Sequence, residues 1–449
     1  SPVGCFLAAG IALALGFDLL EGLSPPADAD SLAYHFTVPK LLLTSGGLFF
    51  IPRANDGAVP MLQQLTYMAA LGLGGERTLT LWTMLSGWAA AGVLFSITRA
   101  HAGTAWALAA ALAFLTTPAV IYGGGSGQVE TRNAAFVLIA AIAAVRARQK
   151  LDWRYAALAG VAAGFYAASK YPGLLFIAAC ALPLLFQRRW LACGAAYGAA
   201  ALVAGIQWYA WNAWNTGDPV FPMLFGWLPY SDGVAWDAAH HEYYRTIYQH
   251  GEKPVAATLP FLFLYPFQAT FSTLEAFESR LVGFGPLPLL LLPAAAVGLW
   301  DRRSSLGQSP LAAMALVCFV GYSLWFFLGP SLRVRFHLPL YPILLLCLIV
   351  AVSRAAAAMP ALRWPIASGL AAALLFQAAV HAVYSLNYAK HLFSAESRSA
   401  FLTRNVSYNS GVEWLNTHLG AGNKVAVFNR EVNYLLDVPY FYLNTLVDS

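Results

Sequence analysis

The sequence predicts an all-α polytopic membrane protein of about eleven membrane helices, with short helices along the outer membrane face and the start of a small α/β unit at the C-terminus. Of its 449 residues, 59% are hydrophobic, 14% aromatic and only 10% charged. Soluble domains carry about 25% charged residues, so a chain of this composition has to bury apolar surface in a bilayer. The composition excludes nucleic-acid-binding, intrinsically disordered and disulfide-scaffold proteins.

The membrane helices are predicted from apolar runs of about 20 residues. Nine runs occupy 3–20, 78–98, 104–122, 132–146, 190–210, 281–300, 311–329, 336–353 and 364–384. A further stretch, 155–186, is too long for one span and is interrupted by Lys170, Pro172 and Gly173. Because Pro and Gly end helices, we expect two short helices there, with Lys170 in the turn between them.

The distribution of charge predicts the orientation of these helices. The loops at 99, 146–154, 188–189, 302–303 and 354–363 hold eleven Lys and Arg residues but only two acidic ones. Basic loops face the cytoplasm, so the loops 21–77, 122–131 and 211–280 and the segment 385–449 are predicted to lie outside. The number of predicted spans gives the same orientation for these loops.

The outer segments contain predicted structure of their own. Segments 34–50, 58–73 and 259–271 are apolar but short, which is typical of helices that lie along a membrane surface. Segments 408–419 and 424–428 predict a helix and a strand of an α/β unit. The chain thus divides into a transmembrane catalytic domain, 1–384, and an extramembranous periplasmic segment, 385–449. Because it begins without Met and ends abruptly, we expect both termini to be cut from a longer protein.

Acidic residues outside the membrane are the first candidates for chemistry. Asp28 and Asp30 follow the first span directly, and Glu130 follows a glycine-rich loop before the fourth. Asp28 and Asp30 suit a general base for a hydroxyl or ligands for a hard cation, but they also suit an acidic helix N-terminus. Glu130 equally suits a helix cap.

Basic residues near the same face are the second candidates. Lys170 interrupts an apolar stretch, which suggests either a functional cation or a turn that reaches interfacial water. Arg333 and Arg335 flank the outer end of a predicted span, where paired arginines bind phosphate or reach lipid headgroups. The histidines and cysteines lack metal-ligand spacing, so no metal site is predicted.

Six segments occur in an order and on a membrane side that resemble a known family. They are DADSLAYHFTVPKLLL at 28–43, GQVETRNA at 127–134, ASKYPGLL at 168–175, WYAWNAWNTGDPVFP at 208–222, FGPLPLLLLP at 284–293 and RVRFHLPLYP at 333–342. Together they resemble bacterial GT-C glycosyltransferases, the group related to protein O-mannosyltransferases and the lipid A aminoarabinose transferase. The resemblance extends from about residue 18 to about residue 355.

This resemblance implies roles for individual residues. Asp30 would take the proton of the acceptor hydroxyl, Asp28 would be an additional acid, and Glu130 would orient the acceptor or a cation. Lys170, Arg333 and Arg335 would hold the lipid phosphate. Other substrate-binding residues would come from the first-loop and Lys-Tyr motifs: Tyr34, His35, Lys40 and Tyr171.

The resemblance also implies a bacterial inner-membrane protein whose active site faces the periplasm, and it implies a reaction. A polyprenyl-phosphate-linked sugar would be transferred, with inversion, to a lipid, glycan or protein acceptor in the bilayer, without nucleic acid. No cofactor is certain, and the acidic residues leave a divalent cation open. The alternatives are a secondary transporter or lipid-linked-sugar flippase, a surface-polysaccharide polymerase or ligase that uses His240, His241 and Arg245, and a non-catalytic assembly protein.

Overall fold

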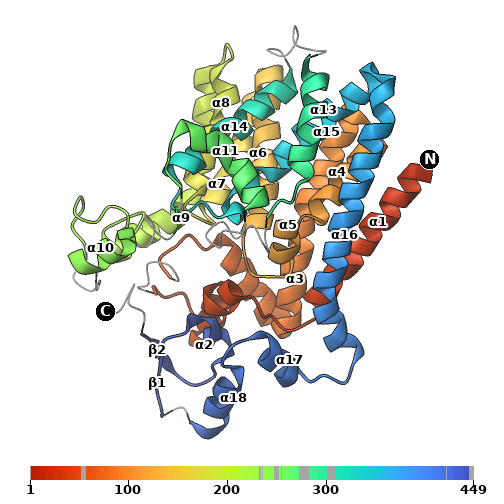
Figure 1. Ribbon diagram of the computed structural model, residues 1–449. Coiled ribbons are helices and arrows are strands. Elements are labelled where there is room, and N and C mark those ends of the chain that lie inside the picture. The colour runs from red at the N-terminus through yellow and green to blue at the C-terminus, as the bar shows by residue number, and fades with distance from the viewer. Residues whose placement is uncertain are drawn as a thin grey trace.

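The computed structural model describes residues 2–51, 57–231, 234, 236–246, 252–253, 255–272, 283–300, 309–420 and 422–443. Its helices are α1 (Pro2–Gly22), α2 (Thr37–Ser45), α3 (Leu62–Ala102), α4 (Thr104–Leu115), α5 (Pro118–Gly124), α6 (Glu130–Lys150), α7 (Trp153–Ala167), α8 (Gly173–Leu185), α9 (Trp190–Thr216), α10 (Ala238–Thr246), α11 (Leu259–Phe271), α13 (Leu287–Trp300), α14 (Pro310–Leu328), α15 (Tyr341–Ala358), α16 (Arg363–Phe393), α17 (Arg398–Asn405) and α18 (Asn409–His418). Short helical turns lie at η1 (Ser31–His35), η5 (Val334–Leu340), η6 (Pro360–Leu362) and η7 (Arg430–Leu435), and the strands are β1 (Val425–Val427) and β2 (Tyr440–Tyr442). Figure 1 shows a bundle of long helices, with α17, α18 and the two strands gathered at one end and α10 projecting to the side.

Each of the eleven predicted membrane segments contains a helix. Within the described residues, six helices are long and apolar enough to cross a membrane, or seven if the bent pair α4–α5 counts as one span. The others are shorter or more polar; α6, for example, carries charges at both ends. The chain is a multi-pass membrane protein.

The long apolar stretch 155–186 folds as the predicted pair of short helices. α7 ends at Ala167 and α8 begins at Gly173, and the turn between them contains Lys170. A side chain at position 173 would place its Cβ 2.6 Å from the Ala167 backbone, so glycine allows this tight turn. The turn places Lys170 at the same end of the bundle as the first outer loop.

Two other helical segments are broken. The segments predicted separately at 58–73 and 78–98 are separate helical stretches of α3, divided by a kink at Gly74 and Gly75, where the backbone is not helical. Gly75 has φ +72°, a conformation that other residues rarely adopt. The predicted span 104–122 is bent by 64° between α4 and α5, because Pro118 favours extended backbone at the preceding residue, Thr117.

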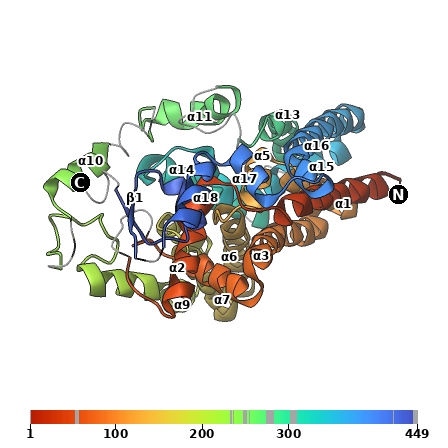
Figure 2. The ribbon, with the colours of Figure 1, turned by 90° about the horizontal axis from the view of Figure 1, so that it is seen from below.

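The C-terminal unit packs on the first outer loop. The predicted helix at 408–419 is α18, and the predicted strand at 424–428 is β1, which pairs in parallel with β2. Leu32 and Phe36 of the first loop share a buried cluster with Val427, Tyr434 and Leu435. Figure 2, seen from below, shows α2, α17, α18 and β1 together at this end. The loop that carries the acidic pair is thus covered by the C-terminal unit.

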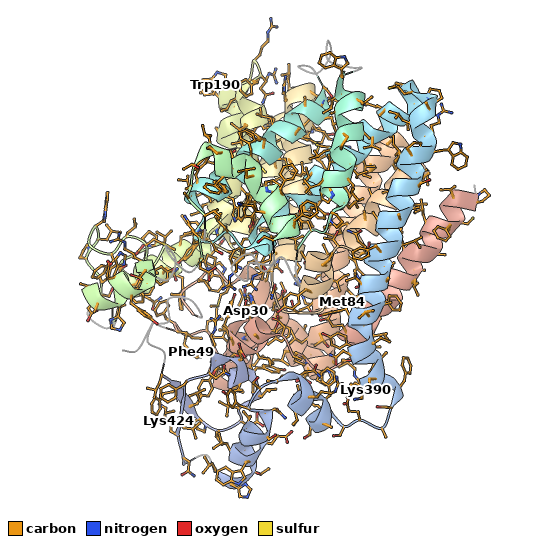
Figure 3. The ribbon with its side chains drawn as sticks, viewed as in Figure 1. Asp30, Phe49, Met84, Trp190, Lys390 and Lys424 are labelled. Atoms are coloured by element: carbon orange, nitrogen blue, oxygen red, sulfur yellow. The ribbon has the colours of Figure 1, made fainter. Side chains whose placement is uncertain are left out.

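The two ends of the bundle differ as the charge pattern predicts. Trp190, beside the basic residues at 188–189, lies at the end opposite Asp30, Lys390 and Lys424 (Figure 3). The basic residues at 302–303 fall outside the described residues. The candidate residues for chemistry therefore lie at the end predicted to face outward.

Candidate active site

A cavity of about 360 Å³ lies where the first outer loop, the α7–α8 turn and the start of η5 meet the C-terminal unit. Its charged lining residues are Asp30, Lys170, Glu252, Arg333, Arg335 and Arg430. Figure 3 shows Asp30 between the helical bundle and the C-terminal elements. Among the described residues of the lining, four cations face two carboxylates, so the cavity suits an anion.

Asp30 is held between two arginines. Arg335 donates Nη1 to its Oδ2 at 2.7 Å, and Arg430 donates Nη2 to its Oδ1 at 3.2 Å. Burial would raise the pKa of Asp30, but the charges of Arg335 and Arg430 outweigh burial and hold it below its ordinary value. The side chain remains 15% exposed. Asp30 is therefore an ionised carboxylate at the edge of the cavity.

Asp28 has a different environment. Its Oδ2 accepts hydrogen bonds from Ser31 N at 2.8 Å and Ser31 Oγ at 2.7 Å, and its Oδ1 accepts from Gln128 Nε2 at 3.1 Å. Burial, and then the charge of Asp30, raises its pKa. Asp28 is not part of the cavity lining. It orders η1 and ties the first loop to the GQVETRNA segment.

Lys170 and Glu130 form a buried pair. Lys170 donates Nζ to Glu130 Oε1, and the ammonium lies 4.3 Å from the centre of the Phe336 ring. Glu130 is 3% exposed and Lys170 21% exposed. The structure thus joins the predicted second acidic loop to the Lys-Tyr turn, and Lys170 faces the cavity beside Arg335.

Arg132 was not a candidate in the sequence, although it lies in the GQVETRNA segment. Its guanidinium donates to the carbonyl oxygens of Gln128, Thr83, Gly124 and Ser126. It is 3% exposed. A buried arginine stabilises a loop when several carbonyls satisfy its donors. Arg132 therefore fixes the glycine-rich loop that in turn holds Asp28.

His35 and Tyr34 both line the cavity. The amide of Gln64 donates Nε2 to His35 Nδ1 at 2.7 Å, so the neutral ring carries its proton on Nε2. Burial, assisted by the charge of Lys170, lowers the pKa of His35 to about 3. The Tyr34 ring lies against it, with centroids 4.0 Å apart. His35 is thus an uncharged hydrogen-bond donor at the cavity.

Tyr171 and Lys40 hold segments together. Tyr171 lines the cavity, donates its hydroxyl to Ala58 O at 2.8 Å and accepts from Asn212 Nδ2 at 2.8 Å. This contact joins the ASKYPGLL and WYAWNAWNTGDPVFP segments. Lys40 lies outside the cavity lining and binds Asp437 of the C-terminal unit at 2.8 Å. The structure brings every predicted site residue to this end of the molecule. Asp28, Glu130 and Lys40 are not among the residues that line the cavity.

Arg333 pairs with a residue that the sequence did not single out. Its Nε and Nη2 each donate to Glu252 at 2.7 Å, and Ser331 Oγ binds the same carboxylate at 2.7 Å. The partners come from loops that are distant in the sequence, so no local pattern indicates them. Of the residues predicted for a polymerase, His240 binds Asp237 at 2.7 Å, and neither His240 nor His241 lines the cavity.

No three His, Cys, Asp or Glu side chains gather as a metal site in the part of the chain that the structure describes. Both oxygens of Asp30 are occupied by arginines. Cationic neighbours do not suit a divalent ion, so the residues present do not fit one at Asp30.

An apolar groove of about 260 Å³ adjoins the cavity. α11, α13, α14 and the start of η5–α15 form its walls. Val334 and His337 line the groove, whereas their neighbours Arg333, Arg335 and Phe336 line the polar cavity. One short segment therefore separates a cationic compartment from an apolar one, which suits a ligand with an anionic head and a hydrocarbon tail.

Comparisons with known proteins match part of the sequence to a family and the whole chain to solved folds. Residues 60–214 match the model of the family described as dolichyl-phosphate-mannose-protein mannosyltransferase. No curated protein matches the chain significantly.

The structure is similar to three solved structures, which represent two proteins. It matches ArnT from Cupriavidus metallidurans in the apo state with TM-score 0.59 and 15% identity, over 98% of this chain and 86% of that one. It matches the same ArnT bound to undecaprenyl phosphate with TM-score 0.57 and 15% identity, over 98% and 85%. It matches the Archaeoglobus fulgidus oligosaccharyltransferase in the apo form with TM-score 0.51 and 12% identity, over 98% and 64%. The fold predicted from the six motifs, that of GT-C glycosyltransferases related to ArnT and protein O-mannosyltransferases, is confirmed.

Proposed function

We propose that the chain is a membrane glycosyltransferase that moves a sugar from a polyprenyl-phosphate donor to the hydroxyl of a lipid, glycan or protein at the outer membrane face. The observation that carries this proposal is the position of Asp30, an ionised carboxylate on a cationic cavity that adjoins an apolar groove. ArnT from Cupriavidus metallidurans, which shares the fold, has been solved bound to undecaprenyl phosphate.

The two compartments support a placement of the donor. The phosphate lies near Lys170 and Arg335, and the polyprenyl tail follows the apolar groove past Val334. Fixed cations in a partly dehydrated cavity stabilise the negative charge that the phosphate gains as it leaves. His35 lines the same cavity as an uncharged ring and therefore adds no charge beside the phosphate.

The reaction is a single displacement. The acceptor oxygen attacks the anomeric carbon while the bond from that carbon to the phosphate oxygen breaks, and the electron pair leaves with the phosphate. The hydroxyl becomes acidic as its oxygen bonds to carbon, so a carboxylate of low basicity, Asp30, accepts the proton late in the step. Because the sugar is never bonded to the protein, the configuration at the anomeric carbon inverts.

Replacement of Asp30 by Asn tests this function. Purified protein is incubated with labelled polyprenyl-phosphate sugars and a membrane extract, and the labelled product is identified. We expect the wild type to transfer the label. The rate of transfer by Asp30→Asn should be lower by about 100-fold or more, because this change removes the base while it keeps the shape of the side chain.

Asp152→Asn is the matched control for this test. Asp152 caps α7 through the Arg154 amide and belongs to a basic loop predicted to be cytoplasmic, so the control should retain activity. Full transfer by Asp30→Asn would contradict the mechanism. Lipid movement without sugar transfer in the wild type would instead indicate a flippase.

A further inference from the structure

The C-terminal unit reaches the cavity through Arg430. This residue begins η7 and lies 400 residues beyond Asp30 in the chain, yet its Nη2 donates to Asp30 Oδ1 at 3.2 Å. Arg335 donates to the other oxygen, Oδ2, at 2.7 Å. Asp30 is therefore fixed from two sides, by the transmembrane domain through Arg335 and by the C-terminal unit through Arg430.

Several contacts hold η7 on the turn that carries Asp30. Lys40 donates Nζ to the carbonyl oxygens of Tyr434 and Leu436, both at 2.9 Å, and to Asp437 Oδ1 at 2.8 Å. The Tyr434 ring packs against Phe36, with centroids 5.9 Å apart. Three acceptors around one ammonium form a geometrically defined clamp. Lys40 thus fixes η7, and η7 fixes Arg430.

We propose that Arg430 is a positioning residue for Asp30, and that the C-terminal unit, held by the Lys40 clamp, contributes this residue to the active site. The proposal rests on the proposed function. The two arginines hold different oxygens of the carboxylate, which restricts rotation of the Asp30 side chain and keeps it at the edge of the cavity, where the acceptor hydroxyl binds.

Arg430 also affects the charge state of Asp30. The titratable and charged groups around Asp30 are Arg335, Arg430, His35, Asp28, Tyr34 and Tyr122. Arg430 lowers the pKa of Asp30, so together with Arg335 it keeps the carboxylate deprotonated and able to accept a proton.

The separation of kcat from the donor KM in sugar transfer by the full chain tests the proposal. We expect Arg430→Gln to lower kcat by about 10-fold with little change in the donor KM, and Arg430→Lys to recover part of kcat, because a lysine restores a charged donor to Asp30. Lys40→Met, which removes the clamp but no group that contacts Asp30, should lower kcat in the same way. Lys424→Gln is the control, because Lys424 is exposed on the same unit and lies near Phe441.

The outcomes are distinct. A kcat of Arg430→Gln equal to that of the wild type overturns the positioning role, and so does a loss of kcat that Arg430→Lys fails to relieve. If Arg430→Gln does not fold, an unchanged kcat in Lys40→Met overturns it. Absence of sugar transfer by the wild type contradicts the proposed function instead.

Discussion

At the scale of single residues, Lys170 serves two partners. Its ammonium pairs with buried Glu130 and lies over the Phe336 ring, yet the side chain still faces the cavity. Glu130 therefore pairs with the Lys170 ammonium and directs it in a protein interior where an unpaired cation is costly. Arg335 likewise binds a carboxylate, that of Asp30, and also lines the cavity. Cations held by carboxylates in this way are ready to bind a phosphate without reorganising.

Free polyprenyl phosphate should inhibit sugar transfer by occupying these cations. We expect Lys170→Gln and Arg335→Gln each to weaken this inhibition by about 10-fold or more, because each removes a charge-assisted hydrogen bond to phosphate. The measurement is the inhibition constant of the free lipid against labelled donor. Arg154→Gln, an exposed change at the opposite end, is the control. Unchanged inhibition in both site variants would remove these residues from the phosphate site.

At the scale of elements, the sequence predicts local features well and long-range ones poorly. The α7–α8 turn follows from Pro172 and Gly173 directly, and the charge pattern predicts which loops lie opposite the cavity. The separation of 58–73 from 78–98 agrees with the kink at Gly74 and Gly75. Arg430 was missed because its partner is 400 residues away, and no local pattern encodes such a pairing.

The packing of α7 against α9 depends on small residues. A Cβ on Gly160 would lie 2.2 Å from Tyr197 O, and one on Gly164 would lie 2.5 Å from Ala201 O. These glycines let two membrane helices approach closely, as small residues four apart commonly do. α7 ends in the turn that carries Lys170. The spacing of α7 and α9 therefore controls where Lys170 meets the cavity.

Gly160→Val should separate these helices. We expect it to destabilise the protein by about 1–3 kcal/mol, because the added methyl groups overlap the Tyr197 carbonyl. Thermal unfolding in detergent measures this loss, and sugar transfer should fall with it. Gly198→Ala on α9 is the control, since its Cβ would meet nothing within 4 Å. Equal stability of Gly160→Val and the wild type would show that the helices can move apart without cost.

At the scale of the whole molecule, the two ends of the bundle have different chemistry. The basic loop at 188–189 lies at one end, and the cavity, the first outer loop and the C-terminal unit lie at the other (Figures 1 and 3). The positive-inside rule predicts that the first end lies in the cytoplasm, so we expect the cavity to open on the outer face. A lipid-linked donor suits that face, because its tail keeps it in the bilayer while its phosphate reaches the membrane surface.

Labelling of single cysteines tests this orientation. In a background that lacks the five native cysteines, Lys424→Cys should react with a membrane-impermeant maleimide in intact inner-membrane spheroplasts, and Arg188→Cys should react only after permeabilisation. Both positions are exposed in the structure, so burial does not limit either reaction. The reverse pattern would place the cavity in the cytoplasm. In that case the donor need not have crossed the membrane on a lipid, and the reason for a polyprenyl carrier at this site would be lost.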